Sequence, residues 1–326
     1  MKKTIYAIAM MLMMGISAFS QTEDTKVILQ SGANTTIYDG TQISTAIGAS
    51  KKGDILYLSE GTYDSFTIDK EILVRGVGGN TWIEGDVTIS IPNNATLTQA
   101  VLEGVNVSGT INITQPATNL IIRNTKVMDV KVNGALTNGL IDRCWITGTF
   151  NMNNNTNNTT VKNSKVTLIS AGSLTYNKCT FLNCNIAHRA NETTAAVFTN
   201  CIIGALAQGY HYHGDFRTNY NCGLKTMESS VFTNTLFNTY DGSIGSSSSQ
   251  TNCYLVEEYS GVCDCGTLES RVNLSEYLGT DGTQVGVYGG STLFTLDPQV
   301  AKVTESTFTV DTDAKKLTVK LKVAAK

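Results

Sequence analysis

The sequence predicts an all-β fold in which short strands coil into a parallel β-helix. From about residue 87 the chain is a series of short β-type runs interrupted by Asn, Gly and Thr. A six-residue pattern (apolar, variable, Asn or Gly or Arg, small, variable, apolar) recurs, starting at positions 102, 122, 141 and 161, which are 20, 19 and 20 residues apart. Such a period fits one coil of three short strands, stacked on the next coil about 4.8 Å away. An antiparallel sandwich would instead need hairpin turns every ~8–12 residues.

The first twenty residues have the features of a bacterial export signal. Lys2 and Lys3 precede an apolar run over residues 5–16, and Ala18 and Ser20 are small residues where a signal peptidase reads the chain. Neither this run nor any later one reaches the roughly 18 apolar residues of a membrane-spanning helix. The first Cys is Cys144, so a lipid anchor is not expected. We predict a cleaved signal peptide (1–20), a leader (21–38), no transmembrane segment, and a secreted, periplasmic or cell-surface protein.

A short helix is predicted to cap the N-terminal end of the β-helix. Asp39 can cap this helix, and its apolar residues Ile43, Ala46 and Ile47 share one face. We therefore place the start of the β-helix domain at residue 39 and its end at residue 290.

Each position of the six-residue pattern has a predicted place in the coil. Positions 1 and 6 point inward, and the small position 4 lies beside a turn. Asn is expected at position 3 because it tolerates the left-handed conformation, and stacked Asn amides can bond from coil to coil. Further copies start at Phe198 and Phe232, whereas both Tyr176 and Phe181 fit as a start in the interval between 161 and 198.

Residues 291–326 are predicted to end in a β-hairpin. Residues 306–310 and 317–323 alternate as strands, with a turn over residues 311–316. The hairpin would either cover the open end of the coil, which protects an exposed sheet edge, or form a small separate β module.

Two segments resemble a known family. The run Asp54–Leu58 followed by Glu60–Tyr63, and the run Asp281–Gly290, resemble the opening and closing segments of right-handed parallel β-helix proteins of the pectate-lyase-like superfamily. The resemblance implies a right-handed, single-stranded, pectin-lyase-like β-helix. It implies no particular activity, because this fold carries many functions.

Composition and charge exclude some classes of protein. With 16% charged and 41% apolar residues, the chain is neither disordered nor too polar for a core. The 24 basic and 27 acidic residues argue against a general nucleic-acid partner, which needs a basic excess. Without Lys2 and Lys3 the basic count is 24 − 2 = 22, so the mature chain carries a charge near −5.

The eight cysteines do not define a site. Cys144 and Cys201 occupy position 4, where a free thiol serves as a small apolar residue. Cys201 and Cys222 are 21 residues apart, about one coil, which would bring them within bridging reach if aligned. Cys263 and Cys265 lack a second ligand pair at zinc-finger spacing. No metal site and no particular cofactor are predicted.

The carboxylates of the regular coils do not form a predicted catalytic pair. Within residues 87–205 the acids are Glu103, Asp129, Asp142 and Glu192, and Asp129 and Asp142 occupy different places in the repeat. The paired carboxylates of glycoside hydrolysis therefore have no evident source here, so an enzymatic activity is left uncertain.

A long insertion holds the candidate catalytic residues. The interval from 198 to 232 spans 34 residues, where a coil needs about 20, and it contains Tyr210, His211, Tyr212, His213, Asp215 and Arg217. In an extended segment the two His side chains point the same way, as an acid–base pair would. We take His211, His213, Asp215 and Arg217 as catalytic candidates, and the two tyrosines as platforms for sugar rings.

Position 5 supplies a candidate binding stripe. In three successive coils it holds Lys126, Trp145 and Lys165, and we expect these side chains to face solvent side by side. Arg123 and Lys162, from position 2, are expected just across the turn. An aromatic platform with flanking cations suits a sugar that bears carboxylate or sulfate.

Three functions are compatible with these patterns. The first is an exported or cell-surface protein that binds polysaccharide, expected to be acidic. The second is a polysaccharide lyase whose base is His, Tyr, Lys or Arg. The third is a structural or adhesive surface protein.

Overall fold

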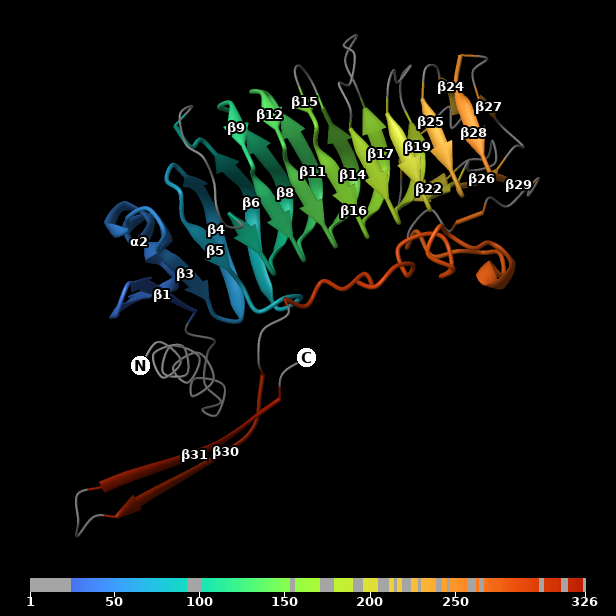
Figure 1. Ribbon diagram of the computed structural model, residues 1–326. Helices are drawn as coiled ribbons and strands as arrows, with labels where there is room; N and C mark the ends of the chain where they lie inside the picture. The colour runs from blue at the N-terminus through green and yellow to red at the C-terminus, as the bar shows by residue number, and fades with distance from the viewer. Residues whose placement is uncertain are drawn as a thin grey trace.

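The structure, a computed structural model, shows a row of stacked coils (Figure 1). It describes residues 25–92, 101–152, 156–170, 179–189, 196–204, 211–213, 216–218, 224–227, 230–238, 242–244, 247–256, 262–263, 267–298, 302–311 and 316–324. The coils form two long sheets of parallel strands and one short sheet, which confirms the predicted parallel β-helix.

Sheet A lines one side of the coils. In spatial order its strands are β2 (Asn34–Asp39), β1 (Lys26–Ser31), β3 (Ile55–Leu58), β5 (Leu73–Arg75), β7 (Leu102–Glu103), β10 (Ile121–Arg123), β13 (Leu140–Asp142), β16 (Thr160–Lys162), β18 (Thr180–Leu182), β20 (Val197–Thr199), β25 (Val231–Thr233) and β28 (Ser249–Thr251).

Sheet B lines a second side and begins a few residues after each strand of sheet A. From the N-terminal coil onward its strands are β4 (Gly61–Ile68), β6 (Thr81–Ile89), β8 (Asn106–Ile113), β11 (Lys126–Val132), β14 (Trp145–Asn151), β17 (Lys165–Ser170), β19 (Asn185–Arg189), β21 (Ile202–Ile203), β26 (Leu236–Asn238) and β29 (Tyr254–Val256). The short third sheet contains β9 (Ala117–Thr118), β12 (Leu136–Thr137) and β15 (Thr156–Asn157).

The strand register confirms the sequence repeat. Ile122 pairs with Ile141, and Ile141 with Val161, as the spacing predicted. Val161 pairs with Phe181 and Phe181 with Phe198. The register that the sequence left open therefore starts at Phe181, not at Tyr176.

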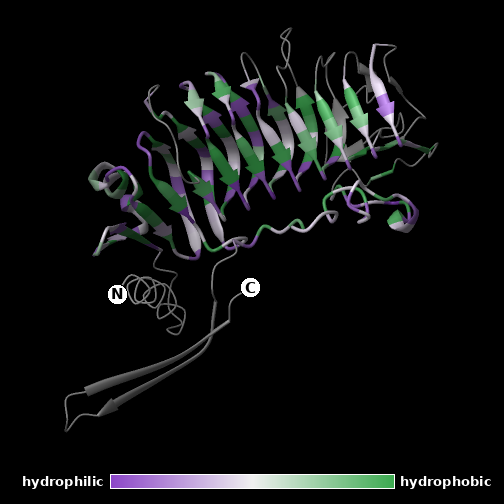
Figure 2. Ribbon diagram, viewed as in Figure 1, coloured by the Kyte–Doolittle hydropathy of each residue, from purple (hydrophilic) through white to green (hydrophobic). Residues whose placement is uncertain are grey.

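The core fills the inside of the coils. Position 1 becomes aromatic in three neighbouring coils, where the ring of Phe198 stacks on Phe181 and Phe232 with centroid distances of 4.9 Å and 5.0 Å. Apolar residues follow the strands along the whole row of coils, while hydrophilic residues gather at the turns (Figure 2). The inward direction of positions 1 and 6 is thus as predicted.

Position 3 adopts the predicted left-handed conformation in every regular coil. The residues concerned have φ between 45° and 54°: Asn124, Arg143, Asn163, Asn183, Asn200 and Asn234. The predicted amide bond between coils occurs at a different turn, where Asn158 Nδ2 donates to Asn138 Oδ1 at 2.6 Å. At position 3 the amides bind another segment instead.

Position 4 forms a buried ladder of small side chains. Cys144 and Cys201 are fully buried free thiols, as predicted. The Ser164 hydroxyl donates to Lys162 O at 2.7 Å, and the Cys201 thiol donates to Thr199 O at 3.3 Å, so each satisfies the backbone of its own turn. Cys201 is a free thiol, so the bridge to Cys222 that the spacing allowed is not formed; Cys222 and Cys265 themselves lie outside the described residues.

The N-terminal end is closed by a hairpin and a helix. Strands β1 and β2 pair antiparallel, and β1 continues sheet A by pairing antiparallel with β3. The fold therefore begins within the stretch that sequence patterns assigned to a leader. The 3-10 turn η1 (Gly40–Gln42) leads into helix α2 (Ile43–Ala49). Its apolar face is buried as predicted: Ile43, Ala46 and Ile47.

A C-terminal segment, which we call the strap (residues 262–263 and 267–298), lies along the outside of the coils (Figure 1). Its contacts with position 3 move toward the N-terminal coils as its own numbering rises. Asn200 binds Thr280, Asn163 and Asn183 both donate to Gly289 O, and Asn124 donates to Thr295 O and Asp297 O. The asparagine amides thus bind the strap.

The last contact of the strap explains a glycine at position 3. Gly104 has φ +66°, and a Cβ on it would lie 2.7 Å from Pro298 Cγ. A larger residue would be strained by its conformation and would also displace the strap.

The strap is held at the C-terminal coils by a second apolar cluster. It contains Ile202 and Leu236, both at position 5, with Val262, Cys263 and Val285 of the strap. Position 5 was predicted to face solvent, and in these coils that prediction is wrong. The reason is that the strap covers the outward side chains. The 3-10 turn η2 (Leu274–Glu276) belongs to the same segment.

The predicted C-terminal hairpin is present as β30 (Lys302–Asp311) and β31 (Lys316–Ala324), which pair antiparallel. Its predicted role, as a cover of the open coil end or as a small separate β module, stays a prediction. Within the described part of the chain, no helix has the length and hydrophobicity to cross a membrane.

Candidate functional site

One outward row of sheet B carries the predicted binding stripe. Lys126 pairs with Trp145 in register, and Trp145 pairs with Lys165. In the other direction Lys126 pairs with Asn106, and Asn106 pairs with Trp82. We call the five residues Trp82, Asn106, Lys126, Trp145 and Lys165 the outward row.

The two lysines hold the Trp145 indole between them. Lys126 Nζ lies 4.5 Å from the ring centroid, and Lys165 Nζ lies 5.3 Å from it, within the range of a cation–π interaction. Lys126 and Trp145 are half-buried, whereas Lys165 is only 3% exposed. The predicted side-by-side arrangement is confirmed, but the predicted exposure of Lys165 is wrong.

The strap buries Lys165. The ammonium group donates to Thr267 O at 2.9 Å and forms an ion pair with the Glu269 carboxylate. The rings of Phe294 and Tyr288 have their centroids 4.9 Å and 5.9 Å from Nζ. With Trp145, three aromatic rings surround this charge.

Tyr288 is tied to the same carboxylate. Its hydroxyl donates to Glu269 Oε1 at 2.8 Å. Burial, together with this hydrogen bond and the negative charge of Glu269, raises the pKa of Tyr288 to about 12. The tyrosine therefore stays a protonated donor over the whole physiological range.

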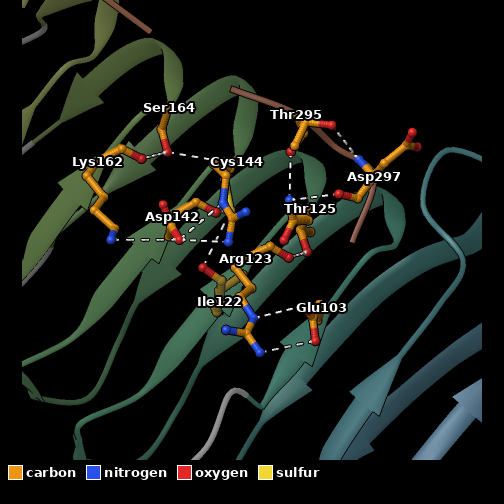
Figure 3. A network of polar contacts seen from close by, with 12 residues as sticks. Glu103, Ile122, Arg123, Thr125, Asp142, Cys144, Lys162, Ser164, Thr295 and Asp297 are labelled. Atoms are coloured by element: carbon orange, nitrogen blue, oxygen red, sulfur yellow. Dashed lines mark hydrogen bonds and ion pairs between the residues drawn. The ribbon is translucent and has the colours of Figure 1, made fainter. Parts of the chain in front are cut away.

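Arg123 and Lys162 contact a different set of residues (Figure 3). Arg123 Nε lies 2.9 Å from Glu103 Oε1, and Lys162 Nζ lies 4.0 Å from Asp142 Oδ2. Arg75 and Arg143 approach the same carboxylates, at 2.7 Å and 3.1 Å. Arg123 and Lys162, which were predicted to contact a ligand, are thus each paired with a carboxylate of the protein.

The strap also separates these charges from the outward row. Thr295 and Asp297 are bound by Asn124 at position 3, which lies between positions 2 and 5. Arg123 and Lys162 therefore do not join Trp145 in one site.

The histidine segment forms its own small hairpin. Strand β22 (His211–His213) pairs antiparallel with β23 (Phe216–Thr218), so that Tyr212 faces Arg217 in register. The hairpin lies in the insertion between Phe198 and Phe232, which pair directly with each other. Tyr210 and Asp215, and the side chains of the other candidates in this segment, lie outside the described residues. Their convergence stays a prediction.

Two further short strands, β24 (Leu224–Met227) and β27 (Gly242–Ile244), pair in parallel with each other. In the chain, β24 precedes β25 and β27 follows β26.

Trp82 is a further residue of the outward row that the sequence repeat did not predict. Its side chain is 44% exposed, and three coil steps place it about 14 Å from Trp145 along the coil axis. Both tryptophans of the chain therefore lie on the outward row. Trp82 precedes Ile83 as Trp145 precedes Ile146, so extending the repeat upstream of residue 87 would have found it.

Two carboxylates were missed for the same reason. Asp64 and Glu84 are register partners on neighbouring coils, and both are exposed. The strap residues Glu269, Tyr288 and Phe294 gave no periodic signal, because they lie outside the repeat.

Comparisons with known proteins assign no family. No protein-family model, no curated protein and no solved structure matches this chain. In the part of the chain that the structure describes, no three His, Cys, Asp or Glu side chains gather as a metal site.

Proposed function

We propose that this protein is exported and binds an acidic polysaccharide along the outward row. The observation that carries the proposal is the placement of both tryptophans on this row, with Lys126 beside Trp145 and between the two rings. The signal-like residues 1–20 support export, and the motifs that resemble pectate-lyase-like proteins are compatible with a carbohydrate ligand.

The spacing of the aromatic residues favours an extended ligand. Indole rings bind sugar rings by stacking, and each stacked ring buries a large apolar area. Because Trp82 and Trp145 are about 14 Å apart along the coil axis, one sugar ring cannot reach both. An oligosaccharide that lies parallel to the axis of the coils can contact both.

The charge of the row favours an acidic ligand. Lys126 makes a cation–π contact with Trp145, and among the described residues it has no ion pair. Its ammonium group can therefore bind a carboxylate or sulfate on a sugar that contacts the exposed part of Trp145. Salt weakens a surface contact of this kind.

The buried carboxylates of the coils favour binding over glycoside hydrolysis. Glu103 lies between Arg75 and Arg123, and Asp142 contacts Arg143 and Lys162. A carboxylate whose oxygens are engaged in such ion pairs is not free to act as a nucleophile.

Titration with polygalacturonate tests the proposal, with neutral dextran as the comparison ligand. Trp82→Ala, Trp145→Ala and Lys126→Gln should each weaken polygalacturonate binding about tenfold, which corresponds to about 1.4 kcal/mol. Added salt should weaken it further. Met128→Ala is the matched control, because Met128 is an exposed apolar side chain on the same strand as Lys126 but not on the row.

Binding that is unchanged in all three variants places the ligand elsewhere and refutes the proposal. The same titration also separates the lyase alternative, because a lyase would generate unsaturated products that absorb ultraviolet light. An adhesive or structural role predicts that neither polysaccharide binds.

A further inference from the structure

We infer that Lys165 is the main anion-recognition residue of the outward row. The Glu269 carboxylate of the strap occupies the anion position beside Lys165 until the carboxylate or sulfate of an acidic sugar replaces it. The inference rests on the proposed function and specifies the ligand as a chain with carboxylate or sulfate groups. It also assigns a role to the strap that a purely structural segment would not have.

A lysine at this position is costly without an anion. Lys165 is 3% exposed, and burying an unpaired ammonium group is strongly unfavourable because the charge loses its hydration. Further along the same row of sheet B, where the strap also covers position 5, the chain uses the uncharged residues Asn185, Ile202 and Leu236. An uncharged residue therefore serves for packing under the strap, and packing alone does not require the charge at residue 165.

The Lys165 ammonium group lies in a small site, which we call the box, formed by aromatic rings, a backbone carbonyl and one carboxylate. Three of its sides are the rings of Trp145, Tyr288 and Phe294, with centroids 4.9–5.9 Å from Nζ. One of its donors is used by Thr267 O. The remaining strong partner is the Glu269 carboxylate, so a single anion completes the box.

Glu269 is the part of this box that a ligand can reach. Its side chain is 46% exposed, whereas that of Lys165 is 4% exposed. The Tyr288 hydroxyl, which is 2.8 Å from Glu269 Oε1, can donate equally to an incoming carboxylate. Rotation of the Glu269 side chain toward solvent is therefore enough to admit one anion in exchange for another.

The strap itself need not leave the coils. Its other anchors are backbone groups bound by Asn163, Asn183 and Asn200 and the apolar cluster around Val285. A sugar in contact with the exposed part of Trp145 would lie next to the box, so its carboxylate could take the place of Glu269 while the sugar keeps its contact with the indole.

Removing the internal carboxylate should increase affinity. When only a fraction of the sites is free, the apparent affinity for a ligand falls in proportion to that fraction. Glu269→Gln should therefore raise the affinity for polygalacturonate by about threefold to tenfold, and Lys165→Met should abolish the gain. Tyr288→Phe, which loosens Glu269 but keeps the ring, should give a smaller gain.

Glu276→Gln is the matched control for net charge, because Glu276 is an exposed strap carboxylate in η2. Its affinity should stay at the wild-type value, and dextran binding should not change in any variant. Circular dichroism spectra should show that each variant folds.

The outcomes separate the inference from the proposed function. If the wild type binds polygalacturonate and Glu269→Gln binds no more tightly, the inference is overturned and the proposed function stands. If Glu276→Gln gives the same gain, net charge is the cause and the inference is likewise overturned. If no variant binds, both are refuted.

Discussion

The ladder of three phenylalanines makes a sharp prediction about stability. Phe198 is the middle ring, 1% exposed, with Phe181 and Phe232 stacked on its two faces at 4.9 Å and 5.0 Å. Phe198→Ala removes this ring from the centre of the coil and leaves both neighbours without a partner on one face.

The expected cost follows from packing. Truncating a buried Phe to Ala costs about 3–5 kcal/mol when the surroundings do not collapse. Each lost aromatic pair can add about 0.5–1.5 kcal/mol. The rigid coil spacing limits collapse, because backbone hydrogen bonds hold the coils of Phe181 and Phe232 apart. We expect a loss of at least about 4 kcal/mol, against a total stability of about 5–15 kcal/mol.

Urea unfolding followed by circular dichroism measures this loss. Phe198→Leu is the conservative control and should cost clearly less, because it keeps most of the buried volume. Val231→Ala is the surface control: this residue lies on the neighbouring strand and is 43% exposed, so it should change stability by less than about 0.5 kcal/mol. A loss below about 1 kcal/mol for Phe198→Ala would show that the ladder does not support the fold.

Three other outcomes can be checked by the same unfolding assay. Ile141→Asp should prevent folding, because an unpaired buried charge costs several kcal/mol; a folded variant would contradict the stacking. Asn163→Gly keeps the left-handed turn but loses the amide bond to Gly289, so it should cost about 1 kcal/mol, and Asn163→Val should cost about 1–2 kcal/mol more from strain. Burial raises the pKa of Cys144 to about 12 and that of Cys179 to about 11. The thiols of the unfolded chain ionise near pH 8.5. The free energy of unfolding should therefore be at its full value below about that pH and fall as the pH rises toward 12. Equal free energies of unfolding at pH 7 and 10.5 would contradict this prediction.

The regular part of the fold was predictable because it is local and periodic. Ile122, Ile141 and Val161 meet the same surroundings one coil apart, and so the same residue type recurs. Asn recurs at position 3 for a conformational reason that each residue satisfies alone. The side-by-side arrangement of Lys126 and Trp145 followed from the same periodicity.

The candidate site was predictable only in part. Trp145 and its two lysines were found because they sit inside the repeat, whereas Trp82 was missed because the repeat was read only from residue 87. The exposure of Lys165 was predicted wrongly, since nothing in its own coil indicates what covers it. The apolar residues Ile202 and Leu236 at position 5 were an available sign that an outside segment packs there.

The residue pattern is sufficient to predict the coil: its period, its inward residues, its turns and the side chains that follow one another on its outward row. Which of those outward side chains meet solvent depends on how the strap packs against the coils. Lys165 and Glu269 are 104 residues apart, and their contact depends on where the strap returns along the coils. A sequence repeat predicts contacts between residues one period apart, because stacking places them in equivalent surroundings. The strap passes each coil only once, so its contacts with the coils produce no repeat in the sequence.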